Sequence, residues 1–91
     1  MLATIVAVQG GRTRIQQIEA PTVKDCLVAW AGRIDIERMT DEQRTRLRGE
    51  MADFQAPPAE GLVGTWRLET DLGMDLSPRA TVVVVETVLR R

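Results

Sequence analysis

The chain has 91 residues, a formal charge of −1 and 44% hydrophobic residues, proportions typical of one small globular domain rather than a disordered chain. It contains no histidine, the side chain most often used as a general base near neutral pH and the commonest transition-metal ligand. The near-neutral charge provides no net field to attract nucleic acid or an anionic membrane. We therefore expect a single domain over residues 1–91 that binds neither.

The first predicted element is a β-hairpin. Residues 2–8 are rich in β-branched side chains, which favour a strand, and residues 13–20 form the return strand. Between them, Gly10-Gly11 is a two-residue turn that tolerates positive φ at both positions. This turn length predicts that Val6 lies opposite Ile15.

The return strand contains a conflict between two isoleucines. Ile15 and Ile18 are three positions apart and cannot share one face of an unbroken strand. Either the strand bulges near Gln16-Gln17, or one isoleucine faces away from the helices.

A first helix is predicted to begin after Pro21. The Thr22 hydroxyl is placed to accept a hydrogen bond from the first turn, and Asp25 favours the positive end of the helix dipole. Apolar residues recur on one helix stripe: Val23, Leu27, Trp30 and Ile34. Gly32 is the predicted left-handed C-terminal cap.

A second helix is predicted from Thr40 to about Phe54. Thr40 and Gln43 have the spacing of a capping box. The apolar stripe is thin, with Leu47, Met51 and Phe54. We expect this second helix to be the less stable of the two and to lie across the edge of the core.

Residues 62–72 show the clearest alternation in the chain and predict a strand with one wet face. The predicted core side carries Leu62, Trp66, Leu68 and Leu72. The predicted outer side carries Val63, Thr65, Arg67, Glu69 and Asp71.

The most apolar stretch, residues 80–89, does not alternate apolar with polar residues. It predicts a strand in the middle of a sheet, with apolar side chains on both faces that favour burial. The element order is then strand, strand, helix, helix, strand, strand. We predict an α+β fold, ββααββ, with a four-stranded, mainly antiparallel sheet and two helices packed on one face. Outward valines of the last strand would leave an apolar stripe on the uncovered face.

The residues offer little catalytic chemistry. The chain has no P-loop or dinucleotide fingerprint. Cys26 is either a thiol activated near a helix start or, as we expect, a small core residue. Asp71 and Asp75 flank Gly73 without the spacing of a calcium loop. We expect no enzyme, no cofactor and no metal site.

Arginines occur in three groups that would form an anion or RNA patch only if they gathered on one surface. These groups are Arg12 and Arg14, then Arg44, Arg46 and Arg48, then Arg90 and Arg91. Because acidic residues interrupt the second group, a solvated face is the expected arrangement.

The opening hairpin, the Ala20-Pro21-Thr22 junction and the following helix resemble many small bacterial α+β domains, including antitoxins and immunity proteins. No motif specific to one of these families is present, so the resemblance concerns architecture alone.

We therefore hypothesise a small non-enzymatic interaction protein that forms a homodimer through its open sheet face. The expected contact residues are Val63, Thr65, Arg67, Val83 and Val85, although the sequence does not decide which valines of the last strand face outward. The single cysteine favours a reducing compartment, so a cytoplasmic location is expected. The alternative is an inhibitor, such as an immunity protein or antitoxin, that meets a basic protein partner through Glu69, Asp71 and Glu86. An enzyme or small-molecule sensor that works with Cys26, carboxylates or arginines is a third class.

Overall fold

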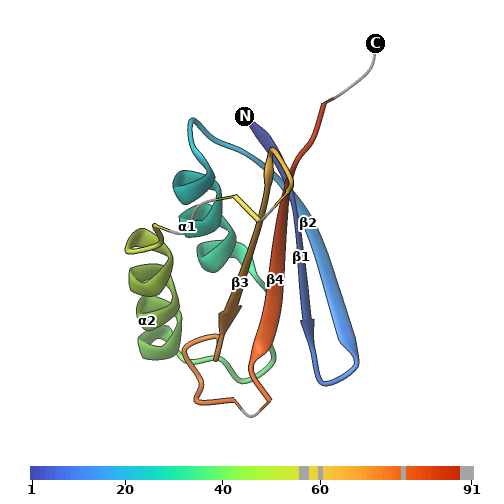
Figure 1. Ribbon diagram of the computed structural model, residues 1–91. Coiled ribbons are helices and arrows are strands. Elements are labelled where there is room, and N and C mark those ends of the chain that lie inside the picture. Colours follow the sequence, from blue (N-terminus) through green and yellow to red (C-terminus); the bar gives the residue numbers. More distant parts are fainter. Residues whose placement is uncertain (56–57, 60, 77, 89–91) are drawn as a thin grey trace.

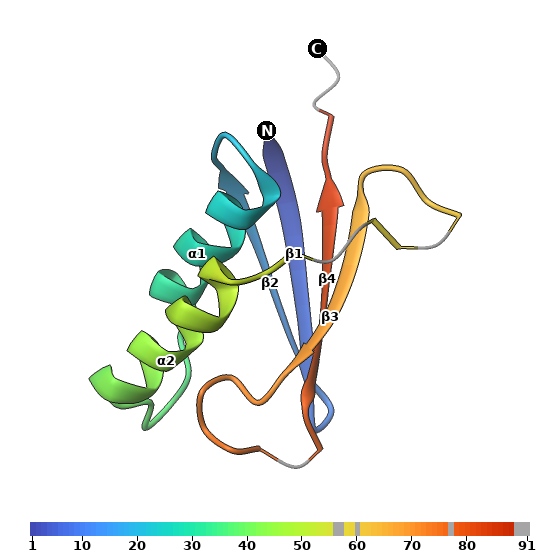
Figure 2. The same ribbon diagram turned by 60° about the vertical axis from the view of Figure 1, so that its left-hand side comes forward.

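The computed structural model describes residues 1–55, 58–59, 61–76 and 78–88. Four strands form one antiparallel sheet in the order β2-β1-β4-β3, and both helices lie on the same side of it (Figures 1 and 2). The elements are β1 (Leu2–Gln9), β2 (Arg12–Glu19), α1 (Val23–Arg33), α2 (Asp41–Ala52), β3 (Thr65–Thr70) and β4 (Ala80–Glu86). The predicted α+β fold, with the order ββααββ, is confirmed.

The β1–β2 hairpin has the predicted register and resolves the isoleucine conflict. Gly10 and Gly11 take φ of 57° and 80°, and Val6 lies opposite Ile15. Pairing runs without interruption from Leu2–Glu19 to Gln9–Arg12, so β2 has no bulge. Ile18 is therefore buried under the helices, whereas Ile15 faces the other side and is 64% exposed.

Helix α1 begins as predicted and ends differently. Thr22 Oγ1 accepts a hydrogen bond from the Asp25 amide at 3.1 Å. The predicted left-handed cap at Gly32 is wrong, because the helix continues to Arg33 and the chain leaves it through Ile34 at φ −57° and ψ 129°. This extended exit places the Ile34 side chain in the core, where it is 1% exposed.

Helix α2 begins with the predicted capping box. The Gln43 amide donates to Thr40 Oγ1 at 3.1 Å, and the Thr40 amide donates to Gln43 Oε1 at 2.8 Å. Leu47 and Met51 are buried, and Phe54, beyond the end of the helix, is half-buried. Helix α2 packs against α1, which itself contacts β1 and β2.

Strand β3 is shorter than the predicted strand over 62–72. Gly64 turns the chain at φ 75°, so Leu62 lies outside the strand and is 56% exposed instead of buried. At the other end, Leu72 reaches the core from a turn, with a left-handed backbone at φ 56°. The predicted burial of Leu72 is therefore confirmed, and Thr70, which has the same parity, is buried as well; its Oγ1 accepts from the Leu72 amide at 3.1 Å.

Strand β4 occupies the predicted central position, paired with β1 on one side and β3 on the other. Val82 and Val84 point toward the helices and are fully buried. Val83 and Val85 have the opposite parity, so the expectation that both faces are buried holds for one face only. The strand ends at Glu86, and residue 89 of the predicted strand lies outside the described residues.

Candidate functional site

The side of the sheet away from the helices carries an apolar centre, which we call the open face. Cross-strand pairing places Val6 beside Val83, with Ile15 on the β2 side and Arg67 on the β3 side. The neighbouring rows of the face consist of Gln17, Thr4, Val85 and Thr65, and of Thr13, Val8, Thr81 and Glu69. Both helices lie on the opposite side of the sheet (Figures 1 and 2).

Three aliphatic side chains of the open face are substantially accessible. Ile15 is 64% exposed, Val8 42% and Val85 38%. Val6 and Val83 lie between them and are half-buried by their neighbours in the sheet. These side chains form one contiguous apolar centre flanked by rows rich in threonine. On most protein surfaces, by contrast, exposed hydrophobic residues are scattered singly.

Most of the expected contact residues lie on the open face. The register places Thr65, Arg67, Val83 and Val85 on that face. Val63 does not lie there, because the turn at Gly64 takes it off the sheet, and its side chain is fully exposed.

Strands β1 and β2 also contribute to this face, although none of their residues was among the expected contact residues. Val6, Val8 and Ile15 share this face with Val83 because β1 pairs with β2 on one side and with β4 on the other. The Gly10-Gly11 turn already predicted that Val6 faces Ile15. The pairing of Val6 with Val83 could not be predicted from the sequence, because these residues are far apart in the chain and no local pattern encodes their contact.

The polar groups of the open face are largely paired within the chain. Arg67 Nη2 and Glu69 Oε1 form an ion pair at 3.3 Å, with side chains 59% and 51% exposed. Gln17 donates to Thr4 Oγ1 at 3.1 Å, and the hydroxyls of Thr4 and Thr87 are 2.6 Å apart. Covering the face would therefore bury few unpaired donors and no isolated charge, which lowers the desolvation penalty.

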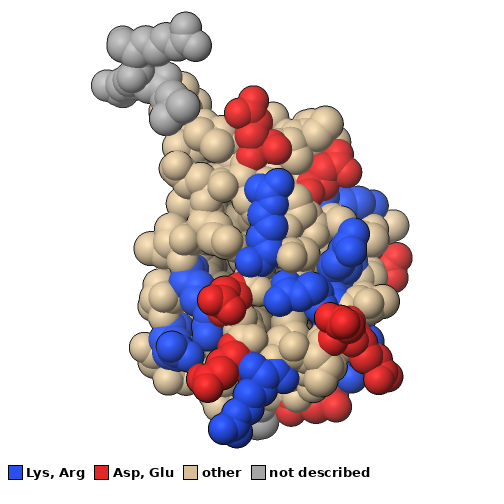
Figure 3. Space-filling model, turned by 180° about the vertical axis from the view of Figure 1, so that it is seen from behind, with Lys and Arg blue, Asp and Glu red and all other residues tan. Residues whose placement is uncertain are grey.

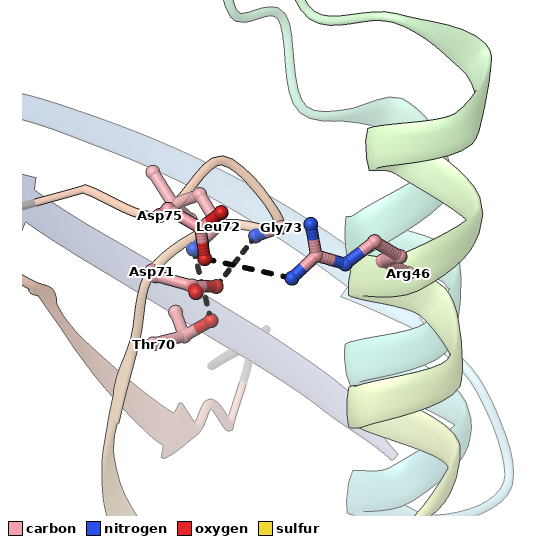
Figure 4. A network of polar contacts seen from close by, with 6 residues as sticks. All are labelled: Arg46, Thr70, Asp71, Leu72, Gly73 and Asp75. Carbon is pink, nitrogen blue, oxygen red and sulfur yellow. Dashed lines mark hydrogen bonds and ion pairs between the residues drawn. The ribbon is translucent and has the colours of Figure 1, made fainter.

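The three acids expected to meet a basic partner are dispersed. Glu69 lies on the open face in its pair with Arg67. Asp71 is half-buried in the following loop, where its Oδ1 accepts from the Gly73 amide at 2.9 Å (Figure 4). Glu86 is paired with Ala3 at the far end of β4, with the parity of the helix side. The structure does not bring these carboxylates into one cluster.

Two arginines of the second group make contacts within the chain. On α2, Arg44 donates to the carbonyl oxygens of Ala31 and Ile34 at 2.9 and 3.0 Å, and Arg46 pairs with Asp75 at 3.6 Å. The last arginine group, at 90–91, lies outside the described residues. Seen from behind, the molecule shows acidic and basic side chains interspersed rather than separated by sign (Figure 3).

Cys26 is a core residue. Its side chain is fully buried, and its Sγ lies 3.7 Å from the Ile18 carbonyl oxygen. Burial raises the pKa of the Cys26 thiol, which lowers the fraction of reactive thiolate at neutral pH.

The described residues provide neither a metal-binding cluster nor a membrane-spanning helix. No group of three or more metal-ligating side chains occurs within them. No described helix is long and apolar enough to cross a membrane.

The chain was compared with known proteins in three ways. No protein-family model, no curated protein and no solved structure matches it.

Proposed function

We propose that two copies of this chain associate through their open faces, and that the protein acts as a non-enzymatic interaction module in the cytoplasm. The observation that carries the proposal is the uncovered apolar centre formed by Val6, Ile15, Val83 and Val85. Two sheets stack face to face about 10 Å apart by interdigitating such side chains. The fully buried, unpaired Cys26 is compatible with a reducing compartment.

A second copy is the occupant that fits the charge of this face. The ion pair of Arg67 with Glu69 leaves the centre of the face electrically neutral, so it offers no attraction to a strongly charged partner. Because a two-fold axis repeats the same surface on both copies, an apolar, neutral face is self-complementary. The inhibitor hypothesis has less support, since Glu69, Asp71 and Glu86 do not gather on one surface.

The size of the face sets the expected strength. Four strands spaced about 4.8 Å apart and about 24 Å long form a flat face of about 450 Å² per copy, or about 900 Å² for a pair. The accessible area is larger than this flat area, because side chains project from the face. Stable interfaces begin at about 1,000–1,200 Å² in total. The estimated area lies just below this range, so we expect a weak dimer that forms only at high protein concentration.

The test is light scattering across a concentration series of the wild-type chain and of Val83→Asp combined with Val85→Asp. We expect the wild-type mass to rise toward that of a dimer, and the double variant to remain a folded monomer. The two aspartates would add two negative charges per copy to the interface, beside a single Arg67 that is already paired with Glu69. Val88→Asp is the matched control, because Val88 is 82% exposed and lies beyond β4. A double variant that stays dimeric, or a wild type that stays monomeric at every concentration, contradicts the proposal.

A further inference from the structure

Three loops meet at the end of the sheet where the β1–β2 hairpin turns, which lies lowest in Figures 1 and 2. They are the hairpin turn, the segment 34–39 between the helices and the segment 71–76 after β3. Between them is an open pocket of about 300 Å³, which we call the arginine pocket. Its polar lining consists of Gln9, Arg12, Arg14, Glu37 and Arg38.

The position of two of these arginines is unusual. Arg14 lies opposite Ala7 and Arg12 opposite Gln9, so both have the parity of the side that faces the helices. That side of a sheet is normally apolar, because helices cover it. The segment 34–39, rather than a helix, lines the pocket beside them. The charged side chains therefore line a hollow at the sheet end instead of a packed core.

The arginine pocket has an excess of positive charge. Its lining includes three arginines and one acidic residue, Glu37. Arg14 Nε donates to the Asp35 carbonyl oxygen at 3.2 Å. Within the described part of the chain, the ion pairs are Arg46–Asp75 and Arg67–Glu69, and neither involves a pocket arginine. The guanidinium groups therefore retain donors for an anion.

The remainder of the lining is apolar and fixed in place. Ile36, Leu72, Met74 and Leu76 supply the apolar surface. The loop after β3 is held by the Thr70 and Asp71 side chains, which accept from the Leu72 and Gly73 amides, and by the Arg46–Asp75 ion pair (Figure 4).

The backbone of the lining is also strained. Leu72 and Arg38 have left-handed backbones, with φ of 56° and 65°. Non-glycine residues hold this conformation only where their surroundings enforce it, so the pocket is preformed.

We propose that the arginine pocket binds a small organic anion. Arg12, Arg14 and Arg38 hold its carboxylate or phosphate, and its apolar body lies against Leu72 and Met74. A guanidinium group matches both anions, because it donates two parallel hydrogen bonds to a pair of oxygens. The pocket volume is at the lower end of the range for small-molecule sites, which limits the ligand to a compact molecule.

The test is an NMR titration with 4-phenylbutyrate, phenyl phosphate and the neutral 4-phenylbutanamide. We expect saturable shifts at the amides of Arg12, Arg38, Leu72 and Met74 with at least one anion, and none with the neutral amide. The stronger of the two anions identifies the ligand as a carboxylate or a phosphate. No saturation by about 10 mM of either anion, or equal binding of the neutral amide, overturns the proposal.

Variants locate the binding. Arg12→Gln and Arg38→Gly should each weaken binding of the better anion about tenfold or more, as expected for the loss of a charge-assisted hydrogen bond. Glycine at 38 accepts the left-handed backbone, so this variant keeps the loop conformation. Arg48→Gln on α2 removes the same charge outside the pocket and should leave binding unchanged. Unaltered binding in both pocket variants, or inorganic phosphate that binds as tightly as phenyl phosphate, contradicts the proposed site.

Discussion

Replacing Gly73 by alanine is expected to destabilise the fold by about 3 kcal/mol, which combines a left-handed backbone cost with overpacking. Gly73 has φ of 71°, and an added Cβ would lie 3.2 Å from the Gln43 carbonyl carbon, 3.3 Å from the Leu47 nitrogen and against the Gln43 carbonyl oxygen. These atoms belong to the backbone of α2 and cannot rotate away. The loop after β3 would have to separate from the helix that it contacts.

The measurement is the free energy of unfolding in denaturant, with Gly49→Ala as the matched control. Gly49 lies inside α2, and a Cβ there meets nothing within 4 Å. Alanine at this position should stabilise the helix by about 0.5–1 kcal/mol. Equal effects of the two substitutions would show that the loop does not pack against α2 as described.

Ile18→Ala is expected to cost about 3 kcal/mol, whereas Ile15→Ala should cost less than about 0.5 kcal/mol. The two residues share one strand, but Ile18 is 2% exposed and Ile15 is 64% exposed. Truncating Ile18 leaves a cavity beneath the helices, and truncating Ile15 removes a side chain that faces solvent within one copy of the chain.

Both truncations are best measured by denaturant unfolding in the Val83→Asp, Val85→Asp background, because that background removes any contribution of association through the open face. Comparable losses at Ile15 and Ile18 would indicate a bulge in β2 or a covered open face, and either would contradict the described sheet. In the wild-type background, the Ile15 substitution should additionally weaken the dimer.

Local patterns in the sequence predicted the features that local chemistry determines. The Gly10-Gly11 turn predicted the hairpin register, and the Thr40–Gln43 spacing predicted the capping box. The continuous valine run predicted the central position of β4, because a strand that is apolar on both faces is typical of the buried interior of a sheet. In each case the interaction lies between residues close in sequence, or depends on composition alone.

Features that depend on tertiary contacts were not predictable in the same way. Both parities of β4 are valine, so only its pairing with β1 decides that Val82 and Val84 are inside. Leu62 matched the alternation of β3 but lies beyond the turn at Gly64. The arginine pocket is formed by three segments far apart in the chain, and no spacing of residues indicates it.

The most direct test of the proposed open-face dimer is an isotope-filtered NMR experiment on an equal mixture of labelled and unlabelled chains. The proposal predicts intermolecular contacts from the methyl groups of Val6, Ile15, Val83 and Val85, with none from the buried Val82 and Val84. Intermolecular contacts confined to helix residues, or their complete absence at millimolar concentration, would contradict it.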